Sequence, residues 1–460
     1  MKIRIKRYLI NIDYWVLLSC LLLLRLPVAL GYRQNPAARL LFLLPLVLVS
    51  AKNLLLTLFK SRIRFSKSLL ILFLFYSLIL ALAFFRNILS DIYPTSTILG
   101  NLFIWVIIAI FGFTLFTTAP DEQTRFVYRR GIFIAISLYF IFNFVMYSFG
   151  FQSPEVLYLR QPKAALLNSF GIHINRVLFP TAQGINSFGS TAGIGWVACF
   201  VILTMPGSKR VDRILAVFGG LSSLAIIIST DSRGALAYTS LLIILILFLP
   251  KMIHDLLRWL PVIAPLLPLT LLFVLRLLPE TVVSTLSRSG SDLANMSNRL
   301  VIWNIVLDEL VNFKWIHLIG FGYRGQVLSG LSSSYSYLFT AWTSNEIASA
   351  HNSLLQSVLD VGYLGSILFI ALLFLLMKKL AQTTQHDRKD YTPKAMLFVL
   401  AYLVLSGITE AVFSTDYQEI FTVFIFIWAA TGTMYEGLPR PQKPVVESAL
   451  PTNPVPWESP

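Results

Sequence analysis

Arg233 is the first residue whose type and surroundings could bind an anion. It stands beside Gly234 in the segment TDSRGA. A guanidinium forms paired hydrogen bonds with phosphate oxygens, and glycine lets a backbone approach closely. The alternative is that Arg233 is a positive charge at a helix junction, paired with Asp231. Both interpretations stay open on the sequence.

His351 and Asn352 open an apolar run through the segment AHNSLLQ. A lone histidine at a helix start is more often structural. Of the five histidines, however, only His351, His173 and His317 are expected on the outer side of the membrane. His351 stands where a lipid head in the membrane and an aqueous acceptor could meet, so it is a candidate for proton transfer.

Arg299 and Trp303 stand one helical turn apart, upstream of His351. Arginine and tryptophan on an amphipathic helix most often anchor it at the membrane interface, so this pair alone does not indicate a site. Two carboxylates within apolar runs, Asp360 and Glu410, are functional candidates by default. Asp360 fits a role in helix packing equally well, whereas Glu410 could orient His351 or balance an arginine.

Several common sites are missing from the sequence. It contains no GxxxxGK[ST], HExxH or Asp-x-Asp pattern, so nucleotide binding, zinc hydrolysis and a metal-dependent sugar-nucleotide site have no support. GFGYRG at 320–325 matches GxGxxG, but no βαβ unit surrounds it, so we interpret the match as chance. Cys20 and Cys199 lie in apolar runs, and we expect neither a disulfide nor a metal site. An anionic substrate would therefore be neutralised by arginines.

The elements that position these residues must be membrane-spanning helices. Of the 460 residues 56% are hydrophobic and 13% charged, and the mean hydropathy is +0.73. These values exclude a water-soluble globule, and uninterrupted apolar runs favour helices over a β-barrel. We expect an all-α polytopic membrane protein with about twelve transmembrane helices, near residues 8–30, 39–58, 68–85, 98–118, 131–149, 188–205, 214–229, 235–249, 259–278, 352–376, 395–411 and 419–434.

The net charge of +15 is best explained by membrane topology. With both termini in the cytoplasm, the inner loops hold about twice as many Lys and Arg residues as the outer loops. We therefore expect cytoplasmic termini, a retained first helix and no nucleic-acid partner.

Two long outer segments depart from a minimal bundle. They run from 150 to 187 and, between the ninth and tenth helices, from 279 to 350, within a membrane domain of residues 1–437. Within the second, we expect Ser297 to cap a helix that the Gly320–Gly322 turn closes, with Leu300, Trp303, Leu307 and Leu310 on one face. The proline-rich segment 438–460 is expected to be a disordered cytoplasmic tail.

The ordered set of motifs resembles the O-antigen ligase family of bacterial envelope enzymes. TDSRGA, then NRLVIW with the GFGY turn, then AHNSLLQSVLDVGYLG carry the resemblance, which covers roughly residues 188–411. The family also includes polysaccharide polymerases and protein O-oligosaccharyltransferases. The resemblance implies a multi-pass protein of the bacterial inner membrane, with membrane lipid around it.

The implied reaction moves a glycan from an undecaprenyl-diphosphate carrier to an acceptor hydroxyl on the outer face of the membrane. By resemblance, His351 is the base, and Arg233 and Arg299 neutralise the leaving diphosphate. Attack opposite the diphosphate would invert the anomeric centre without a metal or another cofactor. Arg176, Asn352, Trp303 and Glu410 are candidate substrate-binding residues.

The acceptor and one alternative function stay open. The acceptor is either a lipid core, as for a ligase, or another carrier-linked glycan, as for a polymerase. The short tail disfavours the protein-glycosylating branch. Some relatives have been labelled bicarbonate transporters, so a transporter of bicarbonate or another small anion is the alternative. Such a transporter would need a polar pathway to the cytoplasm.

Overall fold

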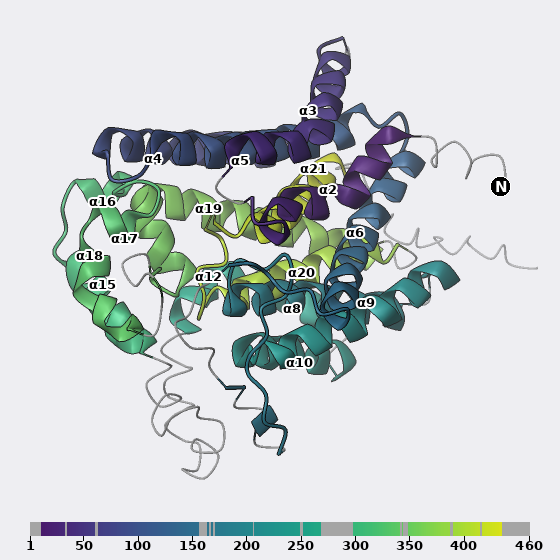
Figure 1. Cartoon of the computed structure of the whole chain (residues 1–460). Coiled ribbons are helices and arrows are strands. Elements are labelled where there is room, and N and C mark those ends of the chain that lie inside the picture. The colour runs from purple at the N-terminus through teal and green to yellow at the C-terminus, as the bar shows by residue number, and fades with distance from the viewer. Residues whose placement is uncertain are drawn as a thin grey trace, which may run out of the picture.

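The structure is a computed structural model, and Figure 1 shows it as a bundle of helices. It describes residues 11–32, 35–59, 63–155, 163–164, 167–168, 171–205, 207–248, 252–267, 298–340, 343, 348–386, 390–414 and 416–434. The long helices are α2 (Ile12–Ala29), α3 (Pro36–Leu58), α4 (Lys67–Ser90), α5 (Thr95–Thr118), α6 (Glu122–Ser148), α8 (Ile185–Thr204), α9 (Arg210–Ser229), α10 (Arg233–Phe248), α15 (Arg299–Val311), α19 (Ser353–His386), α20 (Thr392–Ser406) and α21 (Gln418–Thr433).

Apolar helices long enough to cross a membrane confirm the multi-pass class. Eight described helices have the length and hydropathy of spans, and α10, α20 and α21 are shorter apolar helices. Together they correspond to eleven of the twelve expected segments. The described part of the remaining segment, 259–278, contains only α12 (Leu260–Ile263) and the 3-10 turn η1 (Ala264–Leu266), and its residues from 268 onward lie outside the described chain. The count of twelve and the orientation stay predictions.

One expected span begins earlier than its apolar residues do. Segment 131–149 is the end of α6, which begins at Glu122 because the Asp121 side chain accepts a hydrogen bond from the Thr124 amide at 2.7 Å. The added turns contain arginines that the sequence placed in a loop. Arg129 pairs with Asp390 at 3.1 Å, which ties α6 to the start of α20.

Helix α8 lies at the centre of the bundle, between α6, α9, α10 and α20. Its small residues allow close packing. A Cβ at Gly193 would lie 2.1 Å from the Tyr402 ring, and one at Gly189 would lie 1.8 Å from Ser232 Oγ. The second contact fixes the TDSRGA segment against α8.

The described part of the second long outer segment, residues 298–340, 343 and 348–350, folds into short helices around a core of its own. They are α15, α16 (Ile316–Ile319), α17 (Gly325–Leu328), α18 (Leu331–Tyr335) and the 3-10 turn η2 (Ser336–Phe339), and Figure 1 shows them together at one side of the bundle. This outer core contains Ile302, Val306, Leu310, Tyr335, Ala348, Ala350, Val358 and Leu359. Because Val358 and Leu359 belong to α19, the outer core packs directly on the helix that follows His351.

Two details of the expected outer helix are wrong, and a third, the cap at Ser297, lies outside the described residues. The helix ends at Val311, with α16 between it and the glycine turn. The buried face also contains Ile302 and Val306, whereas Leu307 is 44% exposed. The face therefore turns toward the outer core more than the positions of the leucines alone indicated.

Candidate active site

The connection between α20 and α21 is the centre of the candidate active site. Helix α20 ends at Ser406, so Glu410 lies beyond the span in which the sequence placed it. The backbone of this connection bonds to the start of α19. Ser353 N donates to Gly407 O at 2.8 Å, and Asn352 Nδ2 donates to Ile408 O at 2.9 Å.

Glu410 contacts two of the residues that the sequence predicted to be catalytic, Arg299 and His351. Arg299 Nη2 donates to Glu410 Oε1 at 2.5 Å, and Arg299 Nε donates to Thr409 O at 2.7 Å. His351 Nδ1 lies 3.2 Å from Glu410 Oε2. The three side chains are 16%, 11% and 8% exposed for Arg299, His351 and Glu410, so this triad is mostly removed from water.

The environment of Glu410 keeps its carboxylate ionised. Burial favours the neutral acid, but the charge of Arg299 and the hydrogen bonds from His351 and Arg299 outweigh it and lower the pKa of Glu410 from 4.5 to about 2. An ionised carboxylate can only accept, so His351 Nδ1 donates to it. In the neutral imidazole, Nε2 is then the unprotonated nitrogen, which can accept a proton.

The backbone turns sharply just before each helix that carries a site residue. Asp231, Asn298 and His351 have φ angles of 50°, 67° and 48°, which non-glycine residues rarely adopt. Arg233 and Arg299 are the first residues of α10 and α15, and His351 precedes α19 by two residues. Such strain is concentrated at functional sites.

Asn352 and Trp303 hold this arrangement in place. Asn352 Oδ1 accepts hydrogen bonds from the Leu354 and Leu355 amides at 2.9 and 3.0 Å, so Asn352 caps α19. Trp303 Nε1 donates to Ala350 O at 3.0 Å, beside the histidine. Both were expected to bind substrate, and both make contacts that position His351. They also line the apolar cavity described below.

Helix α19 is broken at Gly362, where φ is 74° and ψ is −178°. Its freed carbonyls accept hydrogen bonds from the GFGYRG segment. Phe321 N donates to Leu359 O at 2.7 Å, and Gly322 N donates to Asp360 O at 3.2 Å. The segment that resembled a nucleotide-binding motif by chance therefore docks the outer segment on the first turns of α19.

A chain of side-chain hydrogen bonds, which was not predicted from the sequence, supports the first turns of α19. Gln356 Oε1 accepts from the Ala350 amide at 3.0 Å, and Gln356 Nε2 donates to Asp360 Oδ1 at 2.8 Å. Asp360 Oδ1 also accepts from Gly325 N at 2.7 Å. The packing role considered for Asp360 agrees with these contacts. The spacing of Gln356 and Asp360, one helical turn apart after the histidine, was the available signal.

Arg233 begins α10 next to the same connection. A Cβ at Gly234 would lie 3.3 Å from Thr409 Oγ1, and Tyr238 OH lies 3.4 Å from that atom. The starts of α10, α15 and α19 therefore all lie beside residues 407–410, α10 through the Thr409 side chain and the other two through backbone carbonyls. Helix N-termini carry partial positive charge, so their meeting favours an anion here.

Arg176 lies behind the TDSRGA turn. Its side chain is buried, Nε donates to Thr230 O at 2.7 Å, and Nη2 bonds to Asn186 Oδ1. The sequence predicted that Arg176 contacts substrate. These contacts instead favour a structural role, in which Arg176 holds the turn in place.

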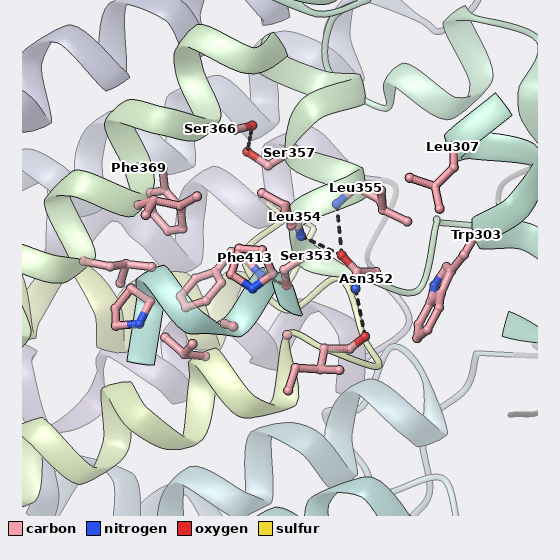
Figure 2. Close-up of a pocket in the computed structure, with 18 of the residues that line it drawn as sticks. Trp303, Leu307, Asn352, Ser353, Leu354, Leu355, Ser357, Ser366, Phe369 and Phe413 are labelled. Carbon is pink, nitrogen blue, oxygen red and sulfur yellow. Dashed lines mark hydrogen bonds between the residues drawn. The ribbon is translucent and has the colours of Figure 1, made fainter. Parts of the chain in front are cut away.

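An apolar cavity of about 360 Å³ opens beside the triad. Figure 2 shows its lining, with Trp303 and Leu307 of α15 on one side and Phe369 and Phe413 on the other. Asn352 and Ser353 lie between them, so the cavity adjoins the start of α19. Pro261, Ala264 and Pro265 also line it. Its walls suit a hydrocarbon chain.

Within the described chain, no group of three or more His, Cys, Asp or Glu side chains is placed to hold a metal ion. The positive groups of the site are instead the guanidinium of Arg299 and the helix start at Arg233.

Comparison with known proteins adds one family. The model of a family described as O-antigen ligase matches residues 218–370, from α9 into α19. The matched region includes Arg233, Arg299 and His351, whereas Arg176 and Glu410 lie outside it. No curated protein matches the chain. The family match gives no support to the alternative of an anion transporter.

Proposed function

We propose that this chain, whose residues 218–370 match the O-antigen ligase family, transfers a glycan from an undecaprenyl-diphosphate carrier to an acceptor hydroxyl at the outer face of the bacterial inner membrane. The observation that carries the proposal is the triad of Arg299, Glu410 and His351 at the meeting point of three helix starts. A multi-pass membrane protein of this family is expected to work on lipid-linked glycans.

His351 is the general base in this proposal. Its Nδ1 donates to Glu410, so Nε2 accepts the proton of the attacking hydroxyl. The acceptor oxygen forms a bond with the anomeric carbon as the bond from that carbon to the diphosphate oxygen breaks. Undecaprenyl diphosphate leaves with the bonding electrons, and the sugar configuration inverts because attack and departure occur on opposite faces.

Arg233 and Arg299 stabilise the leaving diphosphate. Negative charge grows on its oxygens as the bond breaks, and preorganised guanidinium groups lower the energy of that state most effectively where water is scarce. The positive helix ends at 233 and 299 add to the same field. No divalent cation is part of this mechanism.

The apolar cavity takes the lipid part of the carrier next to the membrane span. Its aromatic and aliphatic walls adjoin Asn352, so a chain bound there would place its diphosphate near the triad. Ligase and polymerase share this donor and differ in the acceptor, which is a lipid core or a second carrier-linked glycan.

Envelope glycans of a deletion strain test the proposal. Complementation with wild type should restore long glycan, whereas His351→Ala should not, at equal membrane levels of protein. His173→Ala is the matched control, because His173 is exposed and bonded to Asn168 in a different segment. Accumulated carrier-linked polymer would indicate a ligase, and single repeats a polymerase. Normal glycan with His351→Ala would refute the role of His351.

Substitutions of Arg233 test whether this residue recognises the phosphate through paired hydrogen bonds or acts only through its charge. Arg233→Lys keeps the charge and loses the paired hydrogen bonds, so it should be nearly as inactive as Arg233→Ala. Full activity of the lysine variant would contradict paired binding of the diphosphate.

A further inference from the structure

A second, polar cavity lies where the connection between α20 and α21 reaches α21. Its volume is about 190 Å³, and its lining comes from α2, α8, the start of α21 and the glycine turn of the outer segment. The lining residues are Arg25, Gln183, Ser187, Phe188, Thr191, Arg324, Asp416, Tyr417 and Glu419. None of them belongs to the triad or to the apolar cavity.

Arg25 is the unusual group in this lining. It is 3% exposed near the end of α2, a candidate membrane span, and one of its nitrogens, Nη2, pairs with Glu419. Its Nε and Nη1 atoms have no hydrogen-bond partner within the described residues. A buried donor without a partner is costly, so these two atoms indicate a ligand or water that supplies acceptor oxygens.

Three other charged groups of the cavity, Glu419, Arg324 and Asp416, are held in place by their own contacts. Tyr139 OH donates to Glu419 Oε1 at 3.2 Å and bonds to Thr181 Oγ1 at 2.7 Å. Arg324 Nε and Nη2 bond to Asp416 at 3.2 and 3.1 Å, and the guanidinium lies 5.0 Å from the Tyr93 ring centre. The cavity is therefore preorganised before any ligand binds.

We propose that this polar cavity binds one sugar unit of a glycan. Arginine and glutamine donors alternate here with carboxylate and hydroxyl acceptors, and every sugar hydroxyl can both donate and accept. Each arginine of the lining is paired with a carboxylate, Arg25 with Glu419 and Arg324 with Asp416, which favours a hydroxyl-rich neutral ligand over a free anion. The volume lies below the roughly 300–1,000 Å³ of cavities for drug-sized ligands, in keeping with a single ring.

This inference rests on the proposed function, because it identifies where the same glycan substrates are recognised. Glu410 belongs to the triad, and Asp416 and Tyr417 of the same connection line the polar cavity. The connection between α20 and α21 therefore contributes residues to both the triad and the polar cavity. The sugar unit belongs either to the glycan of the donor or to that of the acceptor, and the experiment distinguishes them.

The test uses the full-length protein, purified in lipid nanodiscs, with the variants Gln183→Leu and Thr191→Val. Both keep side-chain size and remove polar atoms, whereas a substitution of Arg25 would leave Glu419 buried and unpaired. Gln123→Leu, on the exposed first turn of α6, is the matched control. Transfer is measured with carrier-linked glycan of natural length and with carrier-linked single sugar, each over a range of acceptor concentrations.

Loss of one hydrogen bond should raise KM by roughly two- to tenfold and leave kcat unchanged. If KM rises for the long donor but not for the single-sugar donor, the cavity binds the donor glycan. If KM rises for the acceptor, the cavity binds the acceptor glycan. Unchanged KM values in both variants, or an equal fall in kcat with every substrate, would overturn the proposal.

Failure of the proposed function is distinguishable. If wild-type protein transfers no glycan, binding of the released repeat-unit oligosaccharide is measured by saturation-transfer NMR. Signal that is lost in Gln183→Leu and kept in Gln123→Leu supports the sugar site, and signal that is equal in all three proteins, or absent from all three, overturns it.

Discussion

Replacing Glu410 by glutamine tests the triad most directly, because the two oxygens of Glu410 accept from different partners. One accepts from Arg299 and the other lies 3.2 Å from His351 Nδ1. Glutamine has one acceptor oxygen and one NH2 donor. If the oxygen faces Arg299, the NH2 group faces His351 and forces Nδ1 to accept. The proton then moves to Nε2, and the imidazole can no longer take the proton of the acceptor hydroxyl.

Two effects set the expected magnitudes. General-base catalysis contributes about 10²–10⁴-fold, so Glu410→Gln should lower kcat by that order if the tautomer is inverted. The shift in the pKa of Glu410 from 4.5 to about 2 corresponds to roughly 3 kcal/mol in favour of the ionised form, at about 1.36 kcal/mol for each pKa unit. The neutral amide should lose stability of that order.

Single-turnover transfer by purified protein is the assay, together with a thermal melt of the same samples. Glu122→Gln is the matched control, because it too removes a carboxylate with two cationic partners, here Arg125 and Arg129, but in the first turn of α6. The control should keep wild-type kcat. A Glu410→Gln protein with wild-type kcat would refute the assignment of Glu410 as the residue that orients His351.

Two further predictions concern stability. Gly320→Ala should lower the free energy of unfolding by about 2–4 kcal/mol, because its Cβ would lie 2.5 Å from Asp360 O. Gly330→Ala has the same φ of 78° and open space, so it should cost only about 1–2 kcal/mol, and equal melting temperatures for the two variants would contradict the clash. Because the folded pKa of Glu410 is depressed, its stabilisation should be complete above pH 4.5 and disappear as the pH falls toward 2. The melting-temperature difference between wild type and Glu410→Gln should therefore hold from pH 7 to 5 and shrink below 4.5, and a difference that stays constant to pH 3 would contradict this.

The sequence predicted the spans well because hydrophobic length is a local property. Segment 98–118, for example, is found as Thr95–Thr118. The early start of α6 was missed, since its charged first turns are stabilised by contacts with Asp212 and Asp390, which are distant in the chain. A hydropathy profile cannot predict ion pairs between residues that are distant in the chain.

The site could be predicted only in part. Arg233, Arg299 and His351 were predicted from residue type and motif order, and Glu410 was predicted to orient His351 or to balance an arginine. The structure brings Glu410 into contact with both Arg299 and His351. The break at Gly362 and its docking on Gly320–Gly322 were missed, because hydrogen bonds between an unwound helix and a distant turn leave no periodic signal in the sequence. The burial of Arg176 likewise depends on a tertiary contact, with Thr230 O.

His351 lies at the boundary between two separately packed bodies. One is the bundle, and the other is the outer core, which includes Ile302, Tyr335 and Leu359. Arg299 belongs to the outer body, whereas Glu410 belongs to the bundle, so the triad forms only when the two bodies dock. Packing changes far from the reacting atoms can therefore alter catalysis by changing how the bodies meet. Natural selection on catalysis in this protein is accordingly also selection on the fit between two hydrophobic interiors.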